Sequence, residues 1–198
     1  SLPRSLLQVH YHNRPGGVTT VMKGYARSFR RLKPTTPVGF FGRNENPAEF
    51  SDSPASLDVK ESDYTWYESV ESFEQTRISL RTALAEHILD TRRFPRPLAV
   101  VAHNLNLGRN VALSAAFADT AFRMVGDDLR FFLIIHDFVE EGRWEAMRAL
   151  NEMTTLGIDA WNHLYPRRGV RYATINRRNE FVLRNAGMQT TVIGTPRS

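Results

Sequence analysis

Cysteine is absent from all 198 positions of the sequence. Disulfide bridges and thiolate metal sites are therefore excluded for this chain, and we expect a cytoplasmic protein. The sequence also lacks any run of about 18 apolar residues, which a membrane-spanning helix would need. Because the first apolar run, residues 6–9, is too short for the core of a signal peptide, we expect no secretory leader.

Lysine is scarce, since it accounts for only three of the 26 basic residues that give a formal net charge of +5. Arginine favours bidentate recognition of phosphate and carboxylate, although genomic base composition explains the same bias. The arginines also occur in scattered pairs: Arg30-Arg31, Arg92-Arg93, Arg167-Arg168 and Arg177-Arg178. This scatter argues against nucleic acid as a partner.

Hydrophobic periodicity predicts alternating strands and helices in one domain, 1–198. Strands are expected at 6–12, 38–42, 98–102, 131–135, 170–175 and 190–193. Helices are expected at 18–32, 68–92, from 110 onward through Phe122 and Val125, at 140–150 and at 177–184. The two strands at 98–102 and 131–135 are apolar throughout, which is typical of a parallel sheet covered on both faces. The pattern favours an α/β fold with a Rossmann-like, doubly wound parallel sheet.

Residues 43–68 carry no clear period and are polar, with Pro47 and Pro54 among them. A stretch of this length without structure is usually a working loop or disordered. We expect a working loop that contains a short strand near 57–60.

The first strand passes through Gly16-Gly17 into a helix whose apolar residues recur at steps of three and four. The helix is expected to bury Val18, Val21, Met22, Tyr25, Phe29 and Leu32. Glycines allow a close approach of the backbone to a ligand, and the start of the following helix favours an anion. A pair of glycines before a helix is also common as a plain tight turn.

Three predicted strands end in histidine: the first at His10 and His12, the next at His103, and another at His136-Asp137. Right-handed crossovers bring the ends of these strands to the same edge of the sheet. Two chemistries use such a cluster. Neutral histidines with Asp137 can bind a metal ion, as in a hydrolase, or they can hydrogen-bond a sugar while the glycine turn receives a diphosphate.

Short motifs in the same order resemble a known family. Gly16-Gly17-Val18 precedes the first helix, Val-Ala-His103-Asn104 closes a strand, and Ile-His136-Asp137 closes a later one. The segments 104–110 and 136–143 add to the match. The chain is similar to the N-terminal half of a GT-B glycosyltransferase, and within that fold most similar to retaining enzymes of family 4.

This resemblance implies a nucleotide-diphosphate sugar as donor and a hydroxyl group as acceptor. It places Gly16 and Gly17 near the donor diphosphate, and His103 beside the transferred sugar with His136 at the equivalent edge of the next strand. His103 and His136 are the catalytic candidates. The substrate-binding candidates are Gly16, Gly17, His12, Asn13, Asn104, Asp137 and Arg143.

The departure from the family is large, because its C-terminal nucleotide-sugar-binding domain and the Glu-x7-Glu signature of that domain are absent. We therefore expect half an enzyme that is inactive alone, with no cofactor and no metal. Contact with a membrane surface is left open. Two alternatives also stay open: a metal-dependent hydrolase that uses His10, His12, His136 and Asp137, and a non-catalytic nucleotide- or glycan-binding domain. Under the leading interpretation, His103 and Gly17 serve transfer and not folding.

Overall fold

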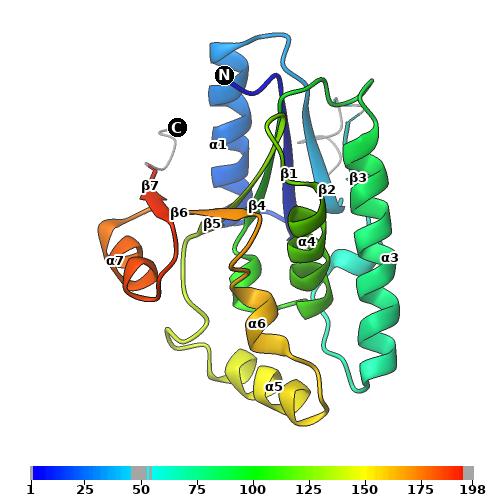
Figure 1. Cartoon of the computed structure of the whole chain (residues 1–198), viewed down its shortest axis with the longest axis vertical. Coiled ribbons are helices and arrows are strands. Elements are labelled where there is room, and N and C mark those ends of the chain that lie inside the picture. Colours follow the sequence, from blue (N-terminus) through cyan, green and yellow to red (C-terminus); the bar gives the residue numbers. More distant parts are fainter. Residues whose placement is uncertain (1, 46–52, 54, 194–198) are drawn as a thin grey trace.

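The computed structural model describes residues 2–45, 53 and 55–193, which form one parallel sheet of seven strands flanked by helices (Figure 1). The strands are β1 Ser5–His12, β2 Val38–Arg43, β3 Leu57–Asp58, β4 Leu98–His103, β5 Leu129–Ile135, β6 Val170–Thr174 and β7 Thr190–Val192. The helices are α1 Gly17–Leu32, α3 Val70–Leu89, α4 Val111–Met124, α5 Trp144–Thr155, α6 Ala160–Leu164 and α7 Arg177–Asn185. Among these helices, none has the length and apolar character needed to cross a bilayer.

The strand order is β3-β2-β1-β4-β5-β6-β7, and every neighbouring pair is parallel. The chain first moves outward from β1 to β2 and β3, and then returns to the other side of β1 to add β4 to β7. This reversal between β1 and β4 is the topological switch point of a doubly wound sheet, where ligands of such folds bind. The predicted Rossmann-like α/β class is confirmed.

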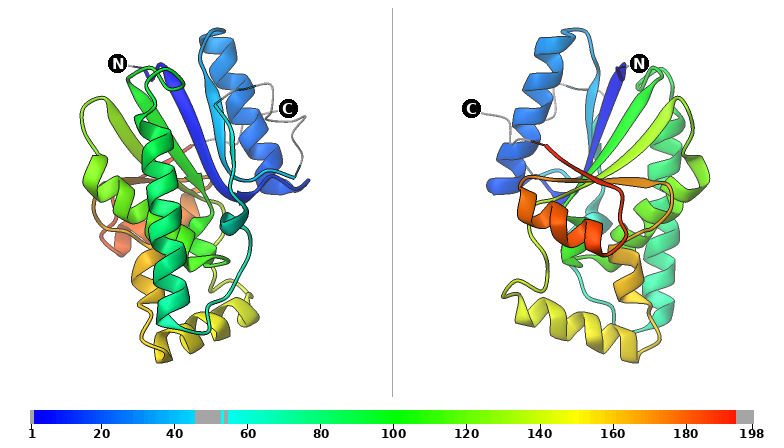
Figure 2. Two further views of the ribbon diagram at one scale, coloured as in Figure 1. Left: turned by 90° about the vertical axis from the view of Figure 1, so that its right-hand side faces the viewer. Right: turned by 60° about the vertical axis from the view of Figure 1, so that its left-hand side comes forward.

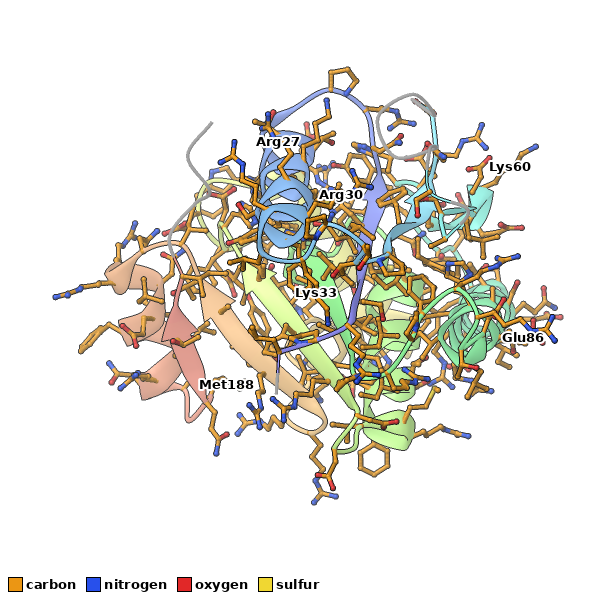
Figure 3. All side chains as sticks on the ribbon, turned by 90° about the horizontal axis from the view of Figure 1, so that it is seen from above. Arg27, Arg30, Lys33, Lys60, Glu86 and Met188 are labelled. Carbon is orange, nitrogen blue, oxygen red and sulfur yellow. The ribbon has the colours of Figure 1, made fainter. Side chains whose placement is uncertain are left out.

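The sheet separates α1 from α3 and α4, as Figure 2 shows in its left view and Figure 3 from above. The larger core lies on the α3 and α4 side, where Leu7, Val100 and Phe131 project from neighbouring strands. A smaller cluster lies under α1, where Ala26 meets Leu6. Most of the buried core is therefore on the face opposite α1.

Four residues that the helical period places in the core are exposed instead. Leu32 is 77% exposed and Phe122 58%, and Val70 and Val125 are also exposed. All four lie in the first or last turn of a helix or just beyond it. Helix α3 also spans only Val70–Leu89, within the predicted 68–92.

Strand β5 is buried on both faces at Ile134 and Ile135, as expected, but on the α1 face the cover is incomplete at Phe132. Phe131 is buried on the side of the larger core, whereas Phe132 is only partly buried against the small cluster beneath α1. The reason is topological: within the described residues α1 is the one helix on that face, and it packs over β1, β2 and β4.

The helix predicted at 140–150 begins later and extends further, as α5 Trp144–Thr155. The residues before it form a loop in which Gly142 has a left-handed φ of 75° and Arg143 pairs with Asp137. The short helix α6 was not predicted. The short strand expected near 57–60 is present as β3, whereas residues 46–52 and 54 of the predicted loop lie outside the described residues.

Candidate functional site

The carboxyl ends of β1, β4 and β5 bring the three predicted histidine positions together at the switch point of the sheet. The His10 ring donates from Nδ1 to the backbone oxygen of His103 over 2.7 Å. The ring of His103 lies next to the ring of His136, and their centroids are 5.9 Å apart. Residues separated by up to 126 positions in sequence therefore form one cluster, as the parallel topology predicts.

Burial keeps this cluster uncharged. His10 is 3% exposed, His103 0% and His136 9%. Desolvation by burial lowers the pKa of His10 to about 3, takes the pKa of His103 well below its ordinary value, and lowers that of His136. At neutral pH these rings can therefore exchange hydrogen bonds with a ligand but cannot neutralise an anion.

The full burial of His103 bears on the expectation that this residue serves transfer and not folding. A side chain with no exposed surface and a hydrogen bond to Gln8 contributes to folding as well as to any ligand chemistry. Gln8 itself was missed by the sequence interpretation. Its signal was present, because a buried amide inside an otherwise apolar strand is uncommon unless it is hydrogen-bonded.

The glycine turn at the start of α1 is open. Neither Gly16 nor Gly17 has a left-handed φ, so the backbone conformation does not require glycine at either position. A Cβ added at Gly17 would meet nothing within 4 Å. Gly16 also supplies no side-chain cap to the helix, and the first turn of α1 holds no acidic residue. Steric need therefore does not explain the two glycines, and the first turn of α1 is open to a ligand.

Two asparagines expected to bind substrate form hydrogen bonds with the protein's own backbone. Asn104, in a left-handed conformation, accepts a 2.7 Å hydrogen bond at Oδ1 from the backbone N–H of His136. Asn13 accepts at Oδ1 from the backbone N–H of Glu45 over 2.8 Å. Both are buried, and these bonds fix the loops that frame the strand ends.

The remaining predicted substrate residues lie at the rim of the cluster. Asp137 and Arg143 form an ion pair of 3.2 Å. His12 accepts a hydrogen bond at Nδ1 from the backbone N–H of Arg14 over 3.3 Å. Its ring lies edge-on to Tyr64, with centroids 4.8 Å apart. Tyr64 was also missed, since nothing in the polar loop around it distinguishes its ring from an ordinary surface tyrosine.

The ligand set proposed for a metal-dependent hydrolase does not assemble in the part of the chain that the structure describes. No group of three or more His, Cys, Asp or Glu side chains there could hold a metal ion. The Nδ1 of His10 is already committed as a donor to a backbone oxygen.

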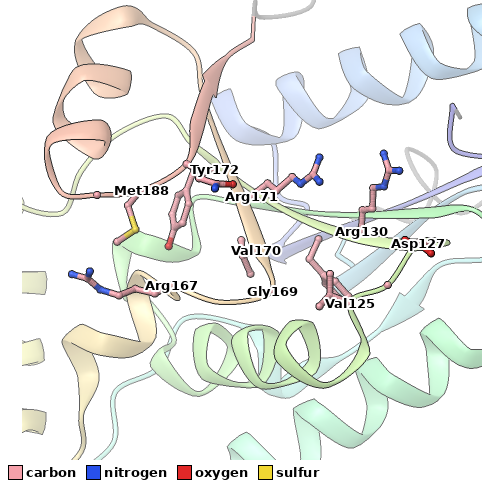
Figure 4. Close-up of a pocket in the computed structure, with 13 residues that line it drawn as sticks. Val125, Asp127, Arg130, Arg167, Gly169, Val170, Arg171, Tyr172 and Met188 are labelled. Carbon is pink, nitrogen blue, oxygen red and sulfur yellow. The ribbon is translucent and has the colours of Figure 1, made fainter.

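A separate hollow lies at the opposite, amino edge of the sheet (Figure 4). Its volume is about 530 Å³, and Arg130, Arg167 and Arg171 contribute to its lining with Asp127. None of the predicted site residues lines it. The hollow is therefore distinct from the histidine cluster.

Comparisons with known proteins give one informative relative. The sequence is 29% identical over 176 residues to a mannosylglucosyl-3-phosphoglycerate synthase from Petrotoga mobilis, covering 84% of this chain and 31% of the synthase. The chain thus spans about a third of that relative's length. No family model matches the sequence. No solved structure matches it either.

Proposed function

We propose that this chain is the acceptor-side domain of a nucleotide-sugar-dependent glycosyltransferase, the N-terminal half of a GT-B enzyme. The observation that carries the proposal is the similarity, across 84% of the chain, to a synthase whose product name joins two sugars to a phosphoglycerate. Such a product is built by transfer of sugars to a hydroxyl group. From the resemblance of the motifs to retaining family 4 enzymes, we further propose that the transferred sugar keeps the configuration of its anomeric carbon.

The geometry of the glycine turn supports a diphosphate at the start of α1. This helix begins at the switch point, has no side-chain cap, and leaves open space above Gly17. The backbone N–H groups of its first turn, which no side chain of the described residues caps, and its positive dipole end favour an anion. In the whole enzyme, these groups would stabilise charge on the departing nucleoside diphosphate, together with cations from the second domain.

The uncharged histidines support a role in orienting hydroxyl groups. An imidazole that stays neutral can accept or donate a hydrogen bond to a sugar or acceptor hydroxyl, and it does not compete for the diphosphate charge. His136 is the more accessible ring, at 9% exposed, and His103 lies behind it. We assign His136 to direct contact and His103 to its support.

The test uses the longer protein that contains this chain, with a panel of nucleotide-diphosphate sugars and phosphoglycerate-type acceptors. The expected result is release of nucleoside diphosphate that depends on the acceptor. Gly17→Val should weaken donor use about 10-fold or more, because its side chain occupies the space above the first turn.

Gly126→Val is the matched control. Gly126 is also exposed and has no left-handed φ, and a Cβ there would meet only the backbone oxygen of Met124 at 4.0 Å, but it lies at the amino edge of the sheet. Equal losses in both variants would count against a ligand at the glycine turn. Acceptor-independent release, or no release with any sugar nucleotide, would refute the proposed activity.

A further inference from the structure

Gln8 occupies the centre of β1, and both ends of its side-chain amide are hydrogen-bonded inside the protein. Its Nε2 donates to the backbone oxygen of Met22 in α1 over 3.1 Å. Its Oε1 lies 3.1 Å from Nε2 of His103 in β4. Gln8 and His103 are both 0% exposed, so water cannot substitute for either bond.

The direction of each bond follows from the chemistry of the partners. A carbonyl oxygen can only accept, so the amide NH2 of Gln8 must face Met22 and its oxygen must face His103. Because that oxygen is also only an acceptor, Nε2 of His103 must carry the hydrogen. Burial takes the pKa of His103 well below its ordinary value, so the ring is neutral and has only one N–H. Its Nδ1 is therefore a bare lone pair.

Nδ1 of His103 has no hydrogen-bond partner within the described residues, and neither does Nε2 of His136. Both atoms are buried, and the two rings are adjacent, with centroids 5.9 Å apart. Unpartnered buried polar atoms are uncommon in folded proteins and often mark functional groups. Here they occur in the two rings that the proposed function uses.

We propose that Gln8 is a positioning residue that holds His103 as the Nε2–H tautomer, so that its Nδ1 serves the site as a hydrogen-bond acceptor. The bond that one ring nitrogen makes determines the role of the other. The link to catalysis rests on the proposed function, whereas the tautomer itself does not.

The tautomer is measured by two-dimensional 1H–15N NMR of the 198-residue chain labelled with 15N-histidine. The sequence contains only six histidines, so each can be assigned by substitution. Two of them are internal references. The Nε2 of His87 donates to the backbone oxygen of Ala55 over 2.8 Å, and the Nδ1 of His10 donates to that of His103. His103 should match His87 and differ from His10.

Gln8→Met keeps the length of the side chain and removes both hydrogen bonds. The His103 ring N–H should then lose its protection from exchange, or the ring should become a mixture of tautomers, while the His87 signal stays unchanged. Leu84→Ala is the matched control, because it loosens a fully buried site on α3, on the other face of the sheet. It should leave the His103 signal as it was.

In the longer protein, Gln8→Met should lower kcat about 10- to 100-fold with little change in KM, as loss of an outer partner of a functional histidine commonly does. A hydrogen on Nδ1 of His103 in the unaltered chain would overturn the inference. So would a protected Nε2–H that survives Gln8→Met. If no sugar transfer is found with any donor, the proposed function fails, yet the NMR result still decides the role of Gln8.

Discussion

Helices α1 and α4 begin at the same edge of the sheet, after the neighbouring strands β1 and β4, yet their first turns differ. Asn110 caps α4 by accepting at Oδ1 from the backbone N–H of Leu113 over 3.1 Å. Its amide nitrogen also donates to two backbone oxygens, those of Glu61 and Asp63, each over 2.8 Å. Helix α1 begins after Gly16, which is exposed and supplies no side chain at all.

The difference distinguishes a helix start that carries a side-chain cap from one that does not. Every helix has N–H groups in its first turn that lack partners within the helix. In α4, the Asn110 side chain accepts from one of them, the N–H of Leu113, and anchors the 61–63 segment with its amide nitrogen. In α1, no side chain of the described residues caps the first turn, and the nearby cluster of histidine rings is uncharged. Four predictions test this contrast, from the largest expected effect to the smallest.

The largest effect is the pH dependence of stability on the β1 side. In the unfolded chain, histidine takes up a proton near pH 6.5, whereas folded His10 has a pKa of about 3 and His103 has one well below 6.5. The unfolded state therefore binds more protons as the pH falls below 6.5, so stability falls with it. For His10 alone the loss from pH 7 to pH 5 should be about 2 kcal/mol, and the lowered pKa of His103 adds to it.

Urea unfolding at pH 7 and pH 5 measures this loss. His10→Gln should reduce the difference by about 2 kcal/mol, since glutamine has no proton to gain. The stability change caused by a substitution at Asn110 should be equal at the two pH values, because no histidine contacts that cap. A stability that is flat from pH 7 to pH 5 would contradict the buried, neutral state of the cluster.

Asn110→Ala should give the next largest effect. It removes a helix cap and leaves the backbone oxygens of Glu61 and Asp63 and the hydroxyl of Tyr67 without their partner. The expected cost is about 3 kcal/mol, which lowers the melting temperature by roughly 6–12 °C in a chain of this size. Asn110→Asp keeps the acceptor but loses the donors. Its melting temperature by calorimetry should therefore lie between those of the unaltered chain and of Asn110→Ala. A loss below about 1 kcal/mol for Asn110→Ala would show that the cap is dispensable.

The same comparison shows which parts of the site were predictable from the sequence. Because parallel strands end at one edge, the meeting of His10, His103 and His136 was predictable from strand periodicity and the handedness of crossovers. Asn110 was predictable as the start of a helix, since asparagine is a favoured cap. These inferences need only local patterns and one rule of topology.

The sequence indicates that Gln8 is hydrogen-bonded, but the partners of Gln8 and Asn104 were not predictable, because folding alone brings each partner near. Gln8 meets His103 from 95 positions away, and the Asn104 side chain bonds the backbone of His136 from 32 positions away. The exposure of Leu32 and Phe122 was missed for a related reason. Periodicity identifies the face of a helix that packs, but not where the surface beneath the helix ends.

Ser69→Ala should give a smaller effect, at the start of α3. The Ser69 hydroxyl accepts from the backbone N–H of Ser72 over 3.1 Å, and this residue is exposed. Its loss should cost about 1 kcal/mol in urea unfolding. Sugar transfer by the longer protein should not change, because Ser69 lies outside the site. A fall in transfer larger than the fall in the folded fraction would show that capping in general, and not the α1 start, affects function.

Gly16→Asn should give the smallest change in stability and the sharpest test of the contrast, because it gives α1 the kind of cap that α4 has. The backbone at Gly16 is extended, with φ 167° and ψ 178°, and any residue can adopt this conformation. Replacing glycine by asparagine at a helix cap should therefore stabilise the chain by only a few tenths of a kcal/mol, or about 1 °C. Transfer by the longer protein should fall in the same variant, because the new side-chain oxygen takes the N–H groups that a diphosphate would need. Calorimetry and donor titration of one preparation measure both. A stabilised variant with undiminished donor affinity would mean that the open start of α1 binds no anion.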